Sequence, residues 1–249
     1  MTMLQAYLNR IKFDEKPEVS LEILRKLHMH HVMAVPFENL TVYQKEAVSL
    51  DLHDLFNKVV TKKRGGYCFE LNSLFAFLLE EIGFEVDYHL ARVYRDGYAE
   101  SGKTHRVNTV LLEGQRYLCD VGFGGNGLLQ ALLLEENVAV EQNGLDYRIT
   151  SLDQETYQLE TVSKEGVTPL YAFTLESCIN ADFEIANHFT ATFPESFFRQ
   201  VLISTRPINN GRISLLDREL TIRSGQEKIV KVFDSPEEAW QYFGNYEAL

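Results

Sequence analysis

The hydrophobic pattern changes its period once, just after residue 83, and this change limits the fold more than any other feature of the chain. Over residues 71–82, apolar residues recur at i, i+3, i+4, i+7, i+8 and i+11, and Gly83 stands where a helix commonly ends. From Glu85 onward, apolar and polar residues alternate instead, as they do along a half-buried β-strand. The chain is therefore expected to combine a helical beginning with a β-rich middle in an α+β fold.

Further elements follow from local signals. Ser20 is a candidate N-cap for a helix that begins at Leu21 and ends before Pro36. Other helices are expected at 52–60, 182–188 and 236–243. Strands are expected at 86–90, 109–112, 117–121, 147–150, 157–162, 212–216 and 219–223, with a hairpin turn at 113–114.

The charge balance excludes several classes of partner. The 249 residues contain 24 Lys and Arg against 36 Asp and Glu, which gives a net charge of −12. Nucleic acids and anionic membranes bind mainly through Lys and Arg, so neither is expected as a partner. A small anionic molecule needs only a local site and stays open. No apolar run approaches the roughly 18 residues of a membrane span, and Arg10 and Lys12 interrupt any signal-peptide core, so we expect a cytoplasmic protein.

Three cysteines without a CxxC pair exclude a disulfide scaffold and a four-cysteine zinc site. One of them, Cys68, follows Arg64-Gly65-Gly66 and directly precedes the strongest predicted helix. The N-terminus of a helix favours a thiolate over a thiol, and its free N–H groups can hold an oxyanion. Arg64 adds a positive charge nearby. Cys68 is thus a candidate nucleophile, although a small buried cysteine in a turn remains an alternative.

A thiolate nucleophile needs a base, and the base needs a partner that orients it. His105 lies at a loop–strand junction, and Asp120 ends the apolar segment 117–121 just before Gly122. The hairpin would place their strands side by side, so that Asp120 accepts the Nδ1–H of His105 and Nε2 faces Cys68. The competing interpretations are a surface histidine and an aspartate that begins a turn.

The order Cys, His, Asp along the chain is that of papain-like and transglutaminase-like enzymes, and it predicts acyl transfer through a thioester. A cluster of three histidines, His28, His30 and His31, is a weaker candidate for a functional site. A metal site would need convergent carboxylate or thiol ligands, and none is suitably spaced. We therefore expect no metal, and an exposed helix end at these histidines.

Five segments together resemble the arylamine N-acetyltransferases. They are PFENL (36–40), RGGYCFELN (64–72), THRVN (104–108), DVGFGG (120–125) and DFEIANHFTATFPESFF (182–198). This resemblance implies that Cys68 carries the acyl group, that His105 is the base and that Asp120 completes a triad. It also implies a ping-pong reaction from acetyl-CoA, as co-substrate, to an arylamine, arylhydroxylamine or hydrazine, with no permanently bound cofactor.

The same resemblance implies a fold in three parts around a papain/transglutaminase-like Cys-His-Asp core. These are a helical bundle (1–84) with the nucleophile, a β-barrel (85–185) with His and Asp, and an α/β lid (186–249). It further implies an acceptor pocket, a tethering ion pair and contacts to coenzyme A. The pocket residues are Phe123, Val93, Tyr67, Phe69 and Gly124; the ion pair is Arg64 with Glu38; the coenzyme A residues are Ser101, Gly102, Lys103 and Thr104.

Three other functions stay open at this point. An amide synthase that closes a macrolactam in polyketide biosynthesis would use the same chemistry with another acyl donor. A transglutaminase or cysteine peptidase would share the order of the triad. A binding module with an inactive triad is disfavoured because all three residues are intact. A homodimer is also open.

Overall fold

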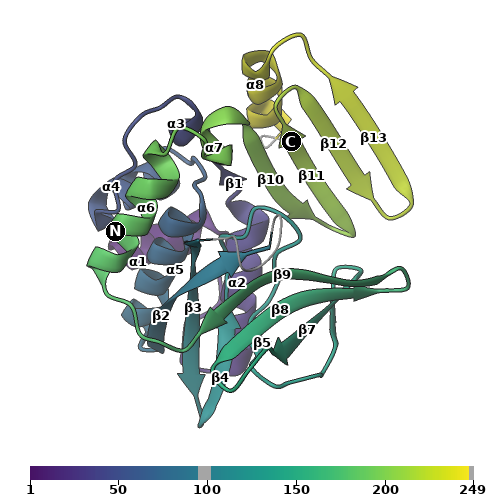
Figure 1. The fold of residues 1–249 in the computed structure, drawn as a ribbon. Helices are drawn as coiled ribbons and strands as arrows, with labels where there is room; N and C mark the ends of the chain where they lie inside the picture. Colours follow the sequence, from purple (N-terminus) through teal and green to yellow (C-terminus); the bar gives the residue numbers. More distant parts are fainter. Residues whose placement is uncertain (95–101, 247–249) are drawn as a thin grey trace.

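The computed structural model describes residues 1–94 and 102–246. Its N-terminal part is helical (Figure 1). The elements are α1 (Met3–Arg10), α2 (Leu21–Ala34), α3 (Leu40–Tyr43), α4 (Leu52–Phe56), a π-helical turn (Asn57–Thr61) and α5 (Cys68–Ile82). The Ser20 side chain accepts a hydrogen bond from the Ile23 amide at 3.3 Å, which confirms the predicted cap. Gly83 ends α5 with φ of +107°, the left-handed conformation that glycine adopts most easily.

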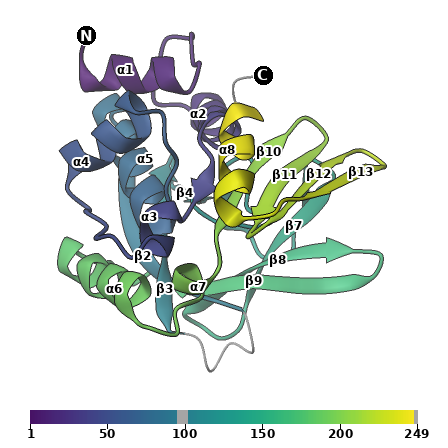
Figure 2. The same cartoon turned by 90° about the horizontal axis from the view of Figure 1, so that it is seen from above.

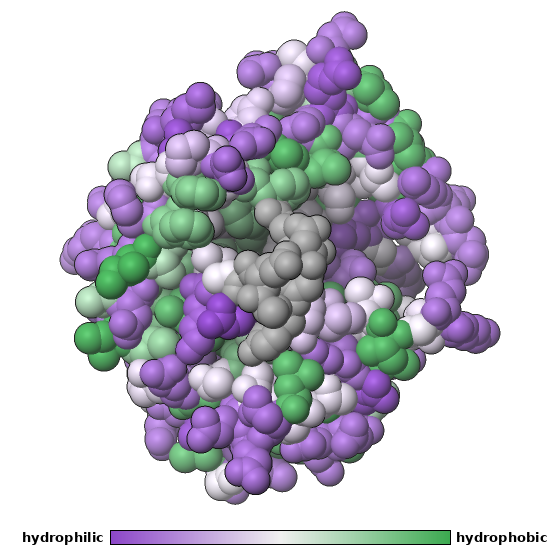
Figure 3. Space-filling model, in the orientation of Figure 1, coloured by the Kyte–Doolittle hydropathy of each residue, from purple (hydrophilic) through white to green (hydrophobic). Residues whose placement is uncertain are grey.

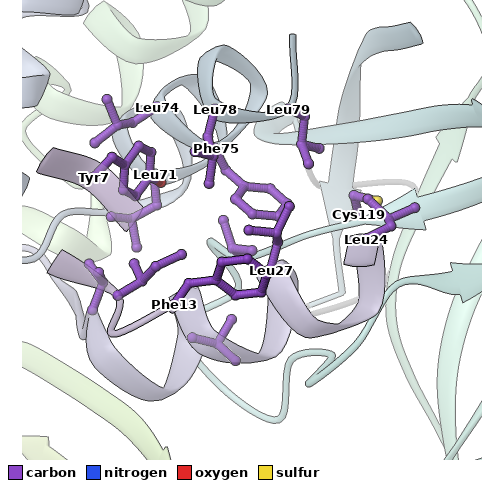
Figure 4. Packing of buried hydrophobic residues seen from close by; sticks show 14 of the residues in the cluster. Tyr7, Phe13, Leu24, Leu27, Leu71, Leu74, Phe75, Leu78, Leu79 and Cys119 are labelled. Carbon is purple, nitrogen blue, oxygen red and sulfur yellow. The ribbon is translucent and has the colours of Figure 1, made fainter. Parts of the chain in front are cut away.

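The helices share one apolar core with the first strands of the barrel. Leu24 and Leu27 from α2 meet Leu74 and Phe75 from α5, all fully buried (Figure 4). Helix α1, which the sequence analysis did not predict, adds Tyr7 and Leu8 to this core. The core fixes the axis of α5, and thereby the position of the residue with which α5 begins.

The middle of the chain forms an eight-stranded antiparallel sheet that curls into a nearly closed barrel (Figure 1). Its spatial order is β5-β4-β3-β2-β9-β8-β7-β6. The strands are β2 (Glu85–Val93), β3 (Lys103–Leu112), β4 (Gln115–Cys119), β5 (Leu132–Leu133), β6 (Val140–Gln142), β7 (Leu145–Ser151), β8 (Thr156–Ser163) and β9 (Gly166–Thr174). The predicted hairpin turn joins β3 to β4, with φ of +51° at Glu113 and +76° at Gly114. Their ladder runs from Leu112–Gln115 to Asn108–Cys119.

The C-terminal part holds a second sheet, of order β1-β10-β11-β12-β13, with a helix packed on it (Figures 1 and 2). Its elements and the helices before it are β1 (Phe37–Glu38), α6 (Asn180–Thr192), α7 (Phe197–Gln200), β10 (Ile203–Ile208), β11 (Gly211–Leu216), β12 (Glu219–Ser224), β13 (Glu227–Val232) and α8 (Pro236–Tyr246). The expected α+β architecture of helices, barrel and terminal sheet is thus confirmed. The divisions at 84/85 and 185/186 stay predictions, and α6 spans the second.

The sequence analysis did not predict β10, because Pro207 interrupts its strand pattern. In the structure, β10 connects β1 to the rest of the terminal sheet. Its neighbour β1 pairs only with Ser204 and Thr205. Beyond those two residues, no strand of the described part of the chain pairs with this side of β10, so a residue without an N–H group is tolerated there. Through β1, the segment 36–40 joins the terminal sheet to the turn before α5.

The surface agrees with the composition. Hydrophilic side chains cover most of the face seen in Figure 3, and hydrophobic ones form separate small patches. Within residues 1–94 and 102–246, no helix has the length and apolar content that a bilayer crossing requires.

Candidate active site

The turn before α5 is held by backbone contacts that only glycine allows. The Glu38 amide donates to the Gly66 carbonyl at 2.8 Å, so the segment 36–40 runs beside the turn. A Cβ at Gly65 would lie 2.1 Å from the Pro36 carbonyl oxygen, well inside van der Waals contact. Gly65 therefore lets the turn pack directly against the segment 36–40, and Gly66 leaves room for the Glu70 side chain, which together set the start of α5.

Ion pairs fasten the same turn. Arg64 Nη2 lies 2.7 Å from Glu38 Oε1, so the predicted ion pair is present. Lys58 Nζ lies 2.7 Å from Oε1 of Glu70, whose Oε2 accepts a hydrogen bond from the Tyr67 amide at 3.1 Å. Both carboxylates are almost fully buried, and each is neutralised by a partly exposed cation.

Cys68 is the first residue of α5 and is 3% exposed. Its Sγ lies 3.8 Å from the Thr104 carbonyl oxygen, next to His105 on β3. Because Cys68 stands in the first turn, its thiolate would face N–H groups that have no acceptor within the helix. The placement at a helix N-terminus agrees with the sequence analysis.

His105 and Asp120 form a hydrogen-bonded pair, but through the other ring nitrogen than predicted. His105 Nε2 lies 2.8 Å from Asp120 Oδ2. The prediction of an Nδ1 contact is wrong because the β3–β4 ladder ends at Asn108–Cys119. Asp120 therefore does not lie opposite His105, and it is contacted by Nε2, the ring nitrogen farther from the backbone. Nδ1 is therefore not used by Asp120, and Cys68 is among the groups that raise the pKa of His105.

The pKa values of His105 and Asp120 are shifted in opposite directions. Burial alone would lower the pKa of His105, but the Asp120 carboxylate and the hydrogen bonds to Asp120 and Cys68 raise it to about 10. Burial alone would raise the pKa of Asp120, but the attraction of His105 and three hydrogen bonds lower it. At neutral pH the site therefore contains an imidazolium that pairs with Asp120 and can pair with a thiolate.

Asn72 was missed as a site residue, although it lies one turn after Cys68 on a buried helix face. Its Nδ2 donates to Asp120 Oδ1 at 2.9 Å and to the Arg106 carbonyl at 2.6 Å, and its Oδ1 accepts from the Val121 amide at 3.0 Å. One amide thus joins α5 to the strands of both other triad residues. Its spacing of i+4 from the cysteine is the signal that could have identified it.

Gly122 allows the loop after Asp120 to touch the nucleophile. A Cβ at this position would lie 2.7 Å from the Cys68 Cα. The Gly122 amide donates to Asp120 Oδ1 at 2.9 Å, which completes the partners of that oxygen. The close approach of loop and helix therefore positions the carboxylate as well as the cysteine.

Cys68 and His105 open into a cavity of about 500 Å³. Its wall is largely aromatic, with Phe37, Phe123, Phe189, Phe193, Phe197 and Phe198. The predicted residues Val93, Phe123, Gly124, Gly102 and Thr104 also line it. The Phe123 ring meets the His105 ring edge-on, with centroids 5.5 Å apart.

Other predicted positions lie elsewhere. Tyr67 and Phe69 are fully buried and pack in a core cluster with Phe183, so the structure does not place them at the cavity wall. Their side chains point away because they flank Cys68 at the tight start of a helix, where neighbouring side chains diverge. Lys103 pairs with Glu176 at 3.0 Å, and Ser101 lies outside the described residues.

The histidine cluster is not an exposed helix end, as had been expected. His28 and His31 are fully buried against Phe75, because α2 turns this face toward α5. His28 Nδ1 lies 3.0 Å from the Leu129 carbonyl oxygen, and His31 Nδ1 lies 2.7 Å from the Tyr7 hydroxyl. Among the described residues, no group of three or more His, Cys, Asp or Glu side chains could hold a metal ion.

Comparison with known sequences gives a consistent assignment. A family model described as N-acetyltransferase matches residues 20–245. The arylamine N-acetyltransferase / N-hydroxyarylamine O-acetyltransferase of Salmonella typhimurium is 34% identical over 88% of this chain and 79% of its own length. The arylamine N-acetyltransferase of Mycolicibacterium smegmatis is 35% identical over 93% of this chain and 86% of its own.

Solved structures agree with the sequence matches. The Salmonella typhimurium arylamine N-acetyltransferase superimposes with a TM-score of 0.94 and 31% identity over 100% of this chain and 92% of that chain. A Mycobacterium marinum arylamine N-acetyltransferase, solved in complex with CoA, gives a TM-score of 0.91 at 28% identity over 98% and 92%. Together with the Cys-His-Asp site described above, these matches show that the chain belongs to the arylamine N-acetyltransferase family.

Proposed function

We propose that this protein transfers an acetyl group from acetyl-CoA to a small arylamine, arylhydroxylamine or hydrazine through a thioester on Cys68. The observation that carries the proposal is the placement of Cys68 at the start of α5, beside the His105–Asp120 pair and at an aromatic cavity. Relatives named as arylamine N-acetyltransferases, one of them solved with CoA, support the choice of donor and acceptor.

In the first half-reaction, the Cys68 thiolate attacks the thioester carbonyl of acetyl-CoA. The bond from Cys68 Sγ to the acetyl carbon forms, the bond from that carbon to the sulfur of coenzyme A breaks, and His105 protonates the departing thiolate. Backbone N–H groups of the first turn of α5 are available to stabilise the oxyanion. Asp120 keeps the His105 ring oriented and stabilises its charge.

In the second half-reaction, the acceptor nitrogen attacks the acetyl-Cys68 carbonyl. His105 removes a proton from that nitrogen, and the Cys68 thiolate departs as the new amide forms. The phenyl rings of the cavity suit a flat aromatic acceptor. We place Phe123 and Val93 nearest to that acceptor. Gly102 and Thr104 line the cavity, so we place the coenzyme A phosphates toward residues 101–104.

Intact-mass spectrometry with acetyl-CoA tests the proposal. We expect one acetyl group per chain, lost on addition of an aromatic amine, and no adduct in Cys68→Ala. Cys178→Ala is the matched control and should acetylate like the wild type. A protein that gains no acetyl group at Cys68 would contradict the acetyl donor and favour another acyl transfer on the same triad.

The location of the protein is part of the proposal. We infer a cytoplasmic enzyme, supported by three cysteines that are all free. Fractionation of the source cells would check it, with activity in the soluble cytoplasmic fraction as the expected result.

A further inference from the structure

Three cations lie close to the start of α5, and two of them are neutralised. Arg64 pairs with Glu38 and Lys58 pairs with Glu70, each at 2.7 Å. The third is Arg106, which follows His105 on β3. Among the residues that the structure describes, no Asp or Glu lies within the 4.0 Å of an ion pair with Arg106. The charge that the sequence analysis assigned to Arg64 is therefore available instead from Arg106.

The side chain of Arg106 is tied to the first turn of α5. Its Nη1 donates to Ser73 Oγ at 2.6 Å, and this hydroxyl donates to the Phe69 carbonyl at 2.5 Å. Phe69 is the residue directly after Cys68. Because successive residues of a strand face opposite ways, Arg106 approaches α5 from the side away from the cavity that His105 faces.

Arg106 is largely buried, and it is one of the residues that line an outer cavity of about 1020 Å³. Arg106 is 5% exposed, and its guanidinium carbon lies 4.3 Å from the centre of the Phe183 ring and 4.9 Å from that of Tyr88. Within residues 1–94 and 102–246, its buried Nε has no hydrogen-bond partner. A buried cation is unfavourable unless negative charge compensates it. Glu80 exerts the largest such influence on Arg106, and Cys68 the next. In the proposed reaction, the thiolate of Cys68 is such a charge.

The other titratable groups around Arg106 do not cancel its charge by direct contact. Glu80 on α5, Tyr88 on β2 and Cys178 before α6 face it, and two residues of α6 line the same outer cavity, Glu184 and His188. Burial lowers the pKa of Arg106 to about 10, while Glu80, Cys68 and Cys178 oppose this shift. The guanidinium thus stays protonated at neutral pH and attracts negative charge on Cys68.

We propose that Arg106 is a positioning residue for the acyl transfer, whose buried charge stabilises the thiolate of Cys68 from beneath the first turn of α5. This inference rests on the proposed function only in taking Cys68 as the nucleophile. The side chains of Arg106 and Cys68 are both 5% exposed or less, and water screens the attraction between buried charges only weakly. The charge, rather than the shape of the side chain, is what the proposal requires.

Alkylation of Cys68 by iodoacetamide, followed from pH 5 to 9 without any acetyl-CoA, tests the charge. We expect Arg106→Met to react about fivefold more slowly than wild type at pH 6 and equally fast at pH 9. Arg106→Lys should stay within about twofold of wild type at both pH values. Arg116→Met is the matched control, because this arginine on β4 is paired with Asp87; its profile should not change.

Two results would overturn the inference. One is a folded Arg106→Met protein with the wild-type pH profile; the other is an Arg106→Lys protein as slow as Arg106→Met. Where the methionine variant does not fold, Arg106→Gln keeps an N–H donor for Ser73 and takes its place. The acetyl adduct of the wild type is a separate measurement, so a failure of the proposed function is distinguishable from a failure here.

Discussion

Two buried histidines differ in charge at neutral pH: His105 is protonated and positive, whereas His28 is neutral. His105 at the end of the barrel and His28 in the helical core are each 3% exposed or less. The pKa of His105 is raised to about 10, against the effect of burial, by its contact with Asp120. The pKa of His28 is lowered to about 4 by burial, which outweighs the hydrogen bond to the Leu129 carbonyl oxygen and the weaker influence of Asp120. A carboxylate in contact, and not the degree of burial, decides which histidine can serve as an acid.

The largest effect is expected where that carboxylate is removed. Asp120→Asn keeps the shape of the side chain but withdraws the negative charge, so the pKa of His105 should fall and the thiolate lose its partner. We expect kcat/KM for acetyl transfer to drop about 10³- to 10⁴-fold. Asp146→Asn, an exposed position on β7, is the control and should be unaffected. Activity of Asp120→Asn within tenfold of wild type would remove the basis of the comparison.

A smaller loss is expected where the loop after Asp120 meets the nucleophile. Gly122→Ala would put a Cβ 2.7 Å from the Cys68 Cα and so push the two apart. Displacements of this kind cost about 100-fold in rate, and we expect a loss of 10- to 100-fold in kcat. Gly244→Ala has open space around its Cβ and is the matched control. If Gly122→Ala turns over normally, close packing of loop and helix is not needed for catalysis.

In the helical core, the expected effect is on the free energy of unfolding at acid pH and not on the activity. Unfolded histidine binds its proton near pH 6.5, whereas folded His28 binds it near 4. Stability is therefore lost as the pH falls from 6.5 to 4, and His28 contributes about 2 kcal/mol of this loss between pH 7 and 5. Urea unfolding of His28→Asn should show a correspondingly smaller difference between the two pH values. The exposed His53→Gln serves as control; a His28→Asn protein as acid-sensitive as this control would contradict the buried, neutral histidine.

The smallest effect is expected at an exposed charge. Lys103 lies between two cavity-lining residues, and its ion pair with Glu176 is open to solvent. Lys103→Ala should raise the KM for acetyl-CoA about threefold, leave kcat unchanged and alter stability by less than about 0.5 kcal/mol. Glu227→Ala, on the exposed strand β13, is the control for surface changes. An unchanged KM would place the phosphates of coenzyme A away from residue 103.

Sequence reasoning succeeded where the chemistry is local and missed what depends on several elements at once. Cys68 was recognisable from two glycines and the following helix, and the hairpin turn at 113–114 from its own residues. The prediction of which His105 ring nitrogen contacts Asp120 was wrong, because this contact depends on where the β3–β4 ladder ends. The burial of His28 could not be read from its helix alone, since α5 and the loop at Leu129 create it.

The proposed role of Arg106 could not be predicted from the sequence either, because it depends on several elements at once. Its neighbours come from α5, β2 and α6, three elements far apart in the sequence. The ion pair of Arg64 with Glu38, which the resemblance already implied, is present, whereas the approach of Arg106 to α5 is visible only in the structure. Similarly, the part of the cavity wall formed by Phe189 and Phe193 depends on where α6 packs against β3.

The protonation of His105 can be measured directly by ¹⁵N NMR of the histidine side chains at pH 7.5, with assignments from His105→Gln and His28→Asn. The account predicts that both ring nitrogens of His105 carry protons, while His28 shows one protonated and one bare nitrogen. In Asp120→Asn, His105 should change to the second pattern. A wild-type His105 with one bare nitrogen at this pH would contradict the charged pair on which the proposed chemistry of Cys68 depends.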